Sequence, residues 1–215
     1  MKDHDLLTFE KKLTRQGYRY IAGVDEVGRG PLAGGVLACA CILDLKQVDG
    51  NITDSKQLTE KKRLLLNETI MNTAVSFAYG YVNEKEIDEI NIYQASRLAM
   101  LRAVKALKVK PDYLLVDAMS LDIDIDQKSI IKGDTLSASI GAASILAKVK
   151  RDEIMEKFHE LYPHYGFNRH KGYPTPDHIK KLNKHKPCAI HRMTYKPVQK
   201  SLLQQVQLDL EMTHD

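Results

Sequence analysis

The chain has 215 residues, enough for one domain or for one domain with a small appendage. Hydrophobic residues make up 43% and charged residues 28% of it, which excludes a wholly disordered or fibrous protein. No apolar run reaches the ~18 residues of a membrane-spanning helix, and the acid-containing start MKDHDLLTFEKKL is unlike a secretory signal. The 3 cysteines are too few for a disulfide framework, so we expect reduced thiols and a cytoplasmic location.

Hydrophobic periodicity and turn residues predict helices and strands along the chain. In chain order these are a helix over 6–16, a buried strand over 20–27, a glycine-rich turn over 28–35, a hairpin-connected strand over 35–43, a helix over 60–73 capped by Thr59, a strand over 75–82, a helix over 92–107 ended by Pro111, a strand over 113–117, a helix over 137–161 and a helix over 177–186. This order predicts an α/β fold with a mixed central sheet flanked by helices.

The longest predicted helix, 137–161, has small residues that would let its backbone pack closely against the sheet. Its predicted apolar stripe consists of Ile140, Ala143, Ala147, Ile154, Phe158 and Leu161. A shift to Gly, Pro, His and Tyr follows near residue 163. We therefore expect a catalytic core over 1–162 and a basic, helical, substrate-binding part over 163–215.

The net charge of +4 is unevenly distributed. Residues 148–200 contain 13 Lys and Arg but 5 Asp and Glu, interleaved with aromatic residues. Such a stretch is typical of a polyanion-binding surface, and a solvated helical face is the alternative.

Three acids stand at the ends of strands that are otherwise apolar. Asp25 and Glu26 end the strand over 20–27, and Asp117 ends the strand over 113–117. Buried carboxylates are costly unless a positive charge compensates them, and a metal ion can do so for all three. Helix capping or pairing with lysine is the alternative for each acid taken alone. Asp25 and Glu26 point to opposite faces of a regular strand, so a shared site requires the strand to end, bend or bulge there.

Carboxylate-rich sites select hard cations such as Mg²⁺ or Mn²⁺. The sequence has no CxxC or HExxH pattern, so zinc is not expected. Acids that hold such ions beside a basic, aromatic surface indicate phosphoryl chemistry on nucleic acid, as in a nuclease, a polymerase or an integrase-like enzyme.

The segment GVDEVGRGPLAGG over 23–35 resembles ribonuclease HII, the bacterial type 2 ribonuclease H. The same family pattern is found in DSK (54–56), LLVDA (114–118), KGD (132–134), SIGAASILAKVKRD (139–152) and YGFNRHKGYPTPDH (165–178). The resemblance covers residues 18–197 and implies a ribonuclease H-like fold. It also implies cleavage of the RNA strand of RNA–DNA hybrids and incision 5′ of ribonucleotides embedded in duplex DNA, leaving 3′-hydroxyl and 5′-phosphate ends.

The family's four acidic residues correspond to Asp25, Glu26, Asp117 and Asp134. The last is known only from the resemblance, because alone it would be interpreted as a turn residue. We expect the four to hold one or two Mn²⁺ or Mg²⁺ ions for in-line hydrolysis. Asp152 is a rival fourth acid, for which a structural ion pair is the alternative.

The family's substrate-reading residues correspond to Gly28, Arg29 and Gly30 and to Tyr173. Glycines allow the backbone to approach a 2′-hydroxyl, and an arginine can hold a phosphate. A plain turn, and for Tyr173 a role in packing, are the alternatives. Lys56 and Lys132 are candidate phosphate contacts, with ordinary surface lysines as the alternative.

Two other functional classes are alternatives. A non-catalytic hybrid-binding protein would not need the full acidic set, and a type 3 enzyme would need a further N-terminal domain for which the chain has no room. The motif QLDL over 207–210 loosely resembles sequences that bind bacterial sliding clamps, with a frayed helix as the alternative. We expect a monomer and no membrane association.

Overall fold

The structure is a computed structural model that describes residues 5–47 and 59–203. Its centre is one mixed sheet of five strands in the order β3-β2-β1-β4-β5. The strands are β1 (Ile21–Val27), β2 (Val36–Ile42), β3 (Ser76–Val82), β4 (Tyr113–Asp117) and β5 (Asp126–Ile130). β1, β2 and β3 form an antiparallel meander, whereas β4 and β5 run parallel to β1. The predicted mixed sheet is therefore confirmed.

The helices are α1 (Thr8–Arg15), α2 (Glu60–Thr73), α3 (Glu84–Lys105), α4 (Ala138–Leu161), α5 (Phe167–His170) and α6 (Pro176–His185), and the described chain ends in a helical segment over 196–203. The predicted helix over 92–107 corresponds to the part of α3 that follows Asn91, whereas the part before it, which begins at a capping box of Asn83 and Glu86, was missed. Asn91, at φ 65°, interrupts the helix and hides its periodicity. Strand β5 was missed because its sequence DQKSI is polar and mostly exposed at the sheet edge.

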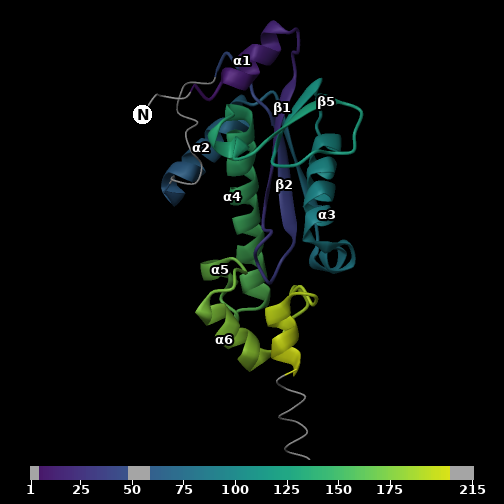
Figure 1. The fold of residues 1–215 in the computed structure, drawn as a ribbon. Coiled ribbons are helices and arrows are strands. Elements are labelled where there is room, and N and C mark those ends of the chain that lie inside the picture. The colour runs from purple at the N-terminus through teal and green to yellow at the C-terminus, as the bar shows by residue number, and fades with distance from the viewer. Residues whose placement is uncertain (1–4, 48–58, 204–215) are drawn as a thin grey trace, which may run out of the picture.

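Helices cover both faces of the sheet, with α3 on one side and α4 on the other (Figure 1). α4 approaches β1 closely at Gly23, where a Cβ would lie 2.0 Å from the carbonyl carbon of Ser139. Cys39 and Cys41 share the face of β2 that packs against α4, as their spacing predicts. No helix of the described residues is both long and apolar enough to cross a membrane.

The C-terminal half of α4 leaves the sheet and packs against α5, at the end of the molecule where α6 also lies (Figure 1). The predicted stripe is therefore wrong at its end, since Leu161 is 69% exposed and Met155 is buried instead. His178 and His191 are buried between these elements, with their Nε2 atoms 3.1 Å apart. These two histidines of the basic stretch thus stabilise the fold.

Glu10 of α1 is fully buried against the N-terminus of α4. Its Oε1 accepts hydrogen bonds from the Ser137 hydroxyl at 2.6 Å and the Ser139 amide at 3.0 Å. The first turn of α4 follows the short 3-10 helix η2 (Gly133–Thr135), so Glu10 also supports the segment that carries Asp134.

Replacing Glu10 with alanine is expected to lower the free energy of unfolding by about 1–3 kcal/mol, because two buried donors lose their acceptor. Urea unfolding measures the change. The matched control is Glu89→Ala, at an exposed position of α3, which is expected to change stability by less than about 0.5 kcal/mol. Equal effects of the two substitutions would contradict this role for Glu10.

Candidate active site

Acids from separate segments line one cavity at the end of β4. β1 pairs with β4 only as far as Val24 and Val116, and the rest of β1 continues beside β2 alone. A cavity of about 380 Å³ lies at this open edge. Its lining residues are Asp25, Glu26, Val27, Arg63, Asp117, Asp134, Ser144, Ile145, Lys148 and Tyr173.

Asp25 and Glu26 both line the cavity although they are neighbours on a regular strand. The register of β1 against β2 is unbroken through Val27, so the expected bend or bulge is absent from this strand. The end of β4 removes the neighbouring strand instead, which leaves room for both side chains. Asp25 accepts a hydrogen bond from the Glu26 amide at 2.8 Å, and Ser144 of α4 contributes a second.

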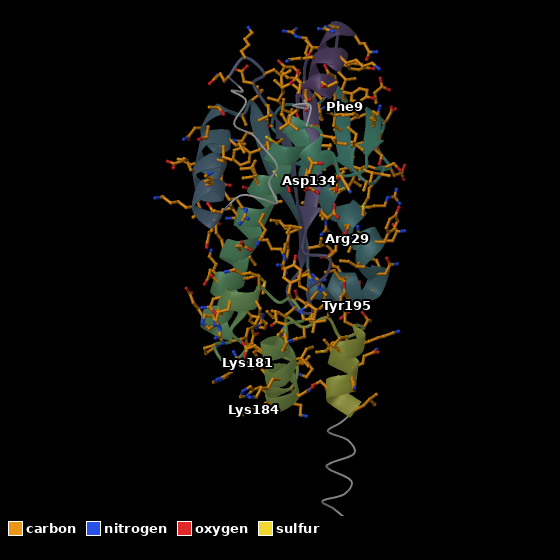
Figure 2. All side chains as sticks on the ribbon, turned by 60° about the vertical axis from the view of Figure 1, so that its left-hand side comes forward. Phe9, Arg29, Asp134, Lys181, Lys184 and Tyr195 are labelled. Atoms are coloured by element: carbon orange, nitrogen blue, oxygen red, sulfur yellow. The ribbon has the colours of Figure 1, made fainter. Side chains whose placement is uncertain are left out.

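Asp117 and Asp134 are brought together by the turn that leads into α4. The Gly133 amide donates to Asp117 Oδ1 at 2.7 Å, which fixes η2 against the end of β4. Lys132 permits this turn by adopting a left-handed conformation at φ 57°. Asp134 is 3% exposed, and it lies at the level of the sheet (Figure 2).

The glycine-rich segment follows directly from β1. Gly28 has φ +98°, a conformation that favours glycine, and the Arg29 guanidinium lies 3.5 Å from Glu26 Oε1. A Cβ on Gly30 would lie 3.5 Å from the Tyr173 ring, so this ring lies beside the segment. Tyr173 is 39% exposed and also lines the cavity, so it lies between the glycine-rich segment and the acids.

The remaining candidate residues lie elsewhere. Lys56 falls outside the described residues, and Lys132 is exposed beside the cavity without lining it. Asp152 forms an ion pair with Lys148 one turn earlier on α4 and does not line the cavity, as the structural alternative predicted. Sequence reasoning missed Arg63, Ser144 and Lys148, because single polar residues on helices give no signal of the cavity they will face.

Burial and neighbouring charges raise the pKa values of Asp25 and Glu26. Burial, then the charges of Glu26 and Asp117, hold the pKa of Asp25 well above its ordinary value. Burial raises the pKa of Glu26, Arg29 opposes the shift, and Asp117 adds to it. Converging carboxylates that disfavour their own ionised forms are typical of a site that a cation completes.

The donor set fits a hard divalent cation. All four acids offer oxygen, and Glu26 Oε2 is buried with no hydrogen-bond partner within the described residues. In the described part of the chain, no three carboxylate, histidine or cysteine side chains are clustered tightly enough to hold an ion as they stand. The acids therefore line a shared cavity and do not form a closed coordination shell.

Replacing Asp25 with asparagine is expected to stabilise the metal-free protein by about 0.5–2 kcal/mol at neutral pH. Folding raises the pKa of Asp25, so above the ordinary carboxyl pKa the folded chain holds a proton that the unfolded chain has lost. The stability of the folded chain therefore falls as the pH rises, and asparagine avoids this loss. Thermal unfolding in chelator at pH 5 and pH 8 measures the difference, which should be larger at pH 8. A lower melting temperature for the variant at both pH values would contradict the electrostatic account.

A mixed sheet flanked by helices, with a carboxylate-lined cavity at a strand end, defines a hydrolase of the ribonuclease H-like class. The sequence pattern of the family described as Ribonuclease HII matches residues 22–198. The chain therefore belongs to the ribonuclease HII family and is a type 2 ribonuclease H, which acts on RNA–DNA hybrids and depends on divalent metal ions.

Individual relatives agree with this assignment. Ribonuclease HII of Bacillus licheniformis is 52% identical over 193 residues, which are 90% of this chain and 76% of that protein. The crystal structure of ribonuclease H2 from Pyrococcus horikoshii OT3 has a TM-score of 0.75 and 27% identity, covering 85% of this chain and 97% of its own. The structure of Bst-RNase HIII in complex with Mn²⁺ has a TM-score of 0.68 and 16% identity, covering 86% of this chain and 69% of its own, and shares the fold.

Proposed function

We propose that this chain incises duplex DNA on the 5′ side of an embedded ribonucleotide, in addition to cleaving the RNA strand of hybrids. The products would carry 3′-hydroxyl and 5′-phosphate ends. The observation that supports this proposal best is the cavity where Asp25, Glu26, Asp117 and Asp134 meet Tyr173, next to the glycine-rich segment.

The four acids would hold one or two divalent ions, Mg²⁺ or Mn²⁺, which suit all-oxygen donors. When bound, such ions supply an activated water and stabilise the departing 3′-oxygen. Gly133 would orient the Asp117 carboxylate through its amide, and Arg29 would share its charge between Glu26 and a substrate phosphate. The Mn²⁺ named for Bst-RNase HIII supports manganese as one of the working ions.

The substrate would be recognised by the backbone of Gly28, Arg29 and Gly30 together with the Tyr173 ring. A ring that touches the glycine-rich segment can stack on the sugar of the next nucleotide, which fits best when that sugar lacks its 2′-oxygen. Lys132, and Lys56 from outside the described residues, would contact flanking phosphates.

The basic part over 163–215 would bind the duplex beyond the cut. Lys181 and Lys184 lie at one end of the molecule, and along its long axis Arg29 lies between these lysines and Asp134 (Figure 2). A duplex that spans this length would contact both the acids and α6. Binding to a sliding clamp through QLDL stays a prediction, because this motif lies outside the described residues. The monomeric state also stays a prediction.

The proposed function is tested with three end-labelled duplexes that share one sequence: all DNA, DNA with one ribonucleotide, and an RNA–DNA hybrid. We expect a single nick 5′ of the ribonucleotide in the second, a ladder in the hybrid and no cut in the first. Extension of the nicked strand by a DNA polymerase, without prior phosphatase treatment, identifies the 3′-hydroxyl. A hybrid ladder without the single-ribonucleotide nick would contradict the proposal while leaving the family activity intact.

A further inference from the structure

Two buried arginines hold the glycine-rich segment from behind. Arg192 is 0% exposed and Arg151 is 1% exposed, and within the described residues neither forms an ion pair with a carboxylate. A buried guanidinium is costly unless its donors are satisfied, so the groups that satisfy it indicate its role.

Arg192 donates to three carbonyl groups of the segment over 28–35. Its Nη2 reaches the carbonyl oxygens of Gly28 at 2.6 Å and Gly34 at 2.7 Å, and its Nη1 reaches that of Arg29 at 2.9 Å. Nη1 also donates to the Tyr195 hydroxyl at 3.0 Å, which in turn donates to the Arg29 carbonyl at 3.1 Å. The first two residues of the Gly-Arg-Gly motif are thereby fixed by their backbone.

These bonds determine which way the peptide groups face. In a trans peptide the N–H points opposite to the C=O, so carbonyls of Gly28 and Arg29 that point at Arg192 direct the amides of Arg29 and Gly30 to the other side. Neither amide has an acceptor among the described residues. The arginine thus leaves two backbone donors available where the segment meets Tyr173.

Arg151 of α4 joins the same segment to the chain that carries Tyr173. Its guanidinium donates to the carbonyls of Ala33 and Gly35, each at 3.3 Å, and to that of Lys171 at 3.0 Å. The Leu32 amide donates to the Gly172 carbonyl at 2.8 Å, next to Tyr173. The motif and the tyrosine therefore form one connected unit, although they are far apart in the sequence.

We propose that Arg192 is a positioning residue for ribose recognition, which fixes the peptide groups of Gly28 to Gly30 and, with Arg151, their distance from Tyr173. This inference rests on the proposed function. Lysine cannot replace the arginine, because a single ammonium lacks the planar set of five donors that reaches several carbonyls at once.

The test measures kcat/KM on the single-ribonucleotide duplex and on the uniform hybrid for Arg192→Lys and Tyr195→Phe. A hybrid offers a 2′-hydroxyl at every register, whereas the single-ribonucleotide duplex offers one, so a misplaced segment should affect the latter more. We expect the ratio of the two values to fall about tenfold or more for Arg192→Lys. We expect a fall of about two- to tenfold for Tyr195→Phe, which removes the hydroxyl's two hydrogen bonds, with Arg192 and with the Arg29 carbonyl, and keeps the ring.

The matched control is Tyr18→Phe, which removes a phenol hydrogen bond to Asp126 of 2.6 Å on β5 and should leave the ratio unchanged. Hydrogen exchange of the Leu32 and Gly34 amides gives a second readout. Both amides belong to the segment over 28–35 and donate to carbonyls of the C-terminal part, those of Gly172 and Ile190, so they should exchange faster in Arg192→Lys. Equal losses on both substrates, with unchanged exchange in this segment, would reduce Arg192 to a stabilising residue and overturn the inference. If the unmodified chain itself does not incise the single-ribonucleotide duplex, the proposed function fails and the inference fails with it.

Discussion

Asp117→Asn is expected to reduce cleavage of both RNA-containing substrates by about 10³-fold, from the loss of roughly 4 kcal/mol of charge stabilisation at the metal site. Asp117 is the acid that links the others: it raises the pKa values of Asp25 and Glu26, and it holds the turn before Asp134 through the Gly133 amide. Asparagine keeps Oδ1 for that amide, so the fold should persist. Single-turnover cleavage at saturating enzyme measures the rate.

Binding of the duplex should change by less than about twofold in the same variant, because the positive charges that contact phosphates are untouched. Asp126→Asn is the control, since Asp126 is an exposed aspartate of β5 that does not line the cavity. It should leave both rate and binding unchanged. Wild-type cleavage by Asp117→Asn would exclude Asp117 as a metal ligand.

Tyr173→Ala is expected to reduce incision at a single ribonucleotide by about 10- to 100-fold, the value of a stacking contact worth about 1–3 kcal/mol. The ring lies beside Gly30 and lines the cavity, so it is placed to contact the nucleotide next to the ribose. Its backbone is held separately by the His170 carbonyl at 2.8 Å and by Nδ1 of His178 at 2.9 Å. Removing the ring should therefore leave the local backbone in place.

Two further variants separate stacking from general loss of a tyrosine. Tyr173→Phe keeps the ring and should retain most of the rate, whereas Tyr93→Ala removes a 49% exposed tyrosine of α3 and should have no effect. Initial rates on the duplex with one ribonucleotide measure all three. Incision at the unmodified rate by Tyr173→Ala would contradict its role in recognition.

Most of the fold could be predicted because buried elements have clear periodicity. β2 is a continuous apolar run, and β1 and β4 are apolar up to the acids near their ends. The small residues of α4 predicted its close packing against the sheet, which the structure shows at Gly23. Strand β5 could not be predicted, because an exposed edge strand needs no apolar pattern. The start of α3 was missed because Asn91 interrupts the helix.

The acids show how far the site could be predicted. Asp25, Glu26 and Asp117 stand out because an acid at the end of an apolar strand is physically costly, and these three do line one cavity. Asp134 gives no such signal, because it lies in a single turn and is brought to the cavity by the bond between Gly133 and Asp117. Only the family pattern pointed to it.

Arg151 and Arg192 were counted with the basic stretch, whose charges predicted a surface for a polyanion. The structure buries both against backbone carbonyls. A sequence gives no local signal for this arrangement, because the glycine-rich segment is far away along the chain. Arg151 is 116 positions from Gly35, and Arg192 is 164 positions from Gly28. The packing of the C-terminal part against the glycine-rich segment is what creates it.

The most direct test of the account is a cleavage assay on a DNA duplex with one ribonucleotide, run without added metal, with chelator, and with Mg²⁺ or Mn²⁺. The account predicts no product in chelator and one nick 5′ of the ribonucleotide once either ion is restored. Cleavage that continues in chelator, or a restored activity that ignores the ribonucleotide, would contradict the claim that the four acids hold metal ions beside a ribose-reading segment.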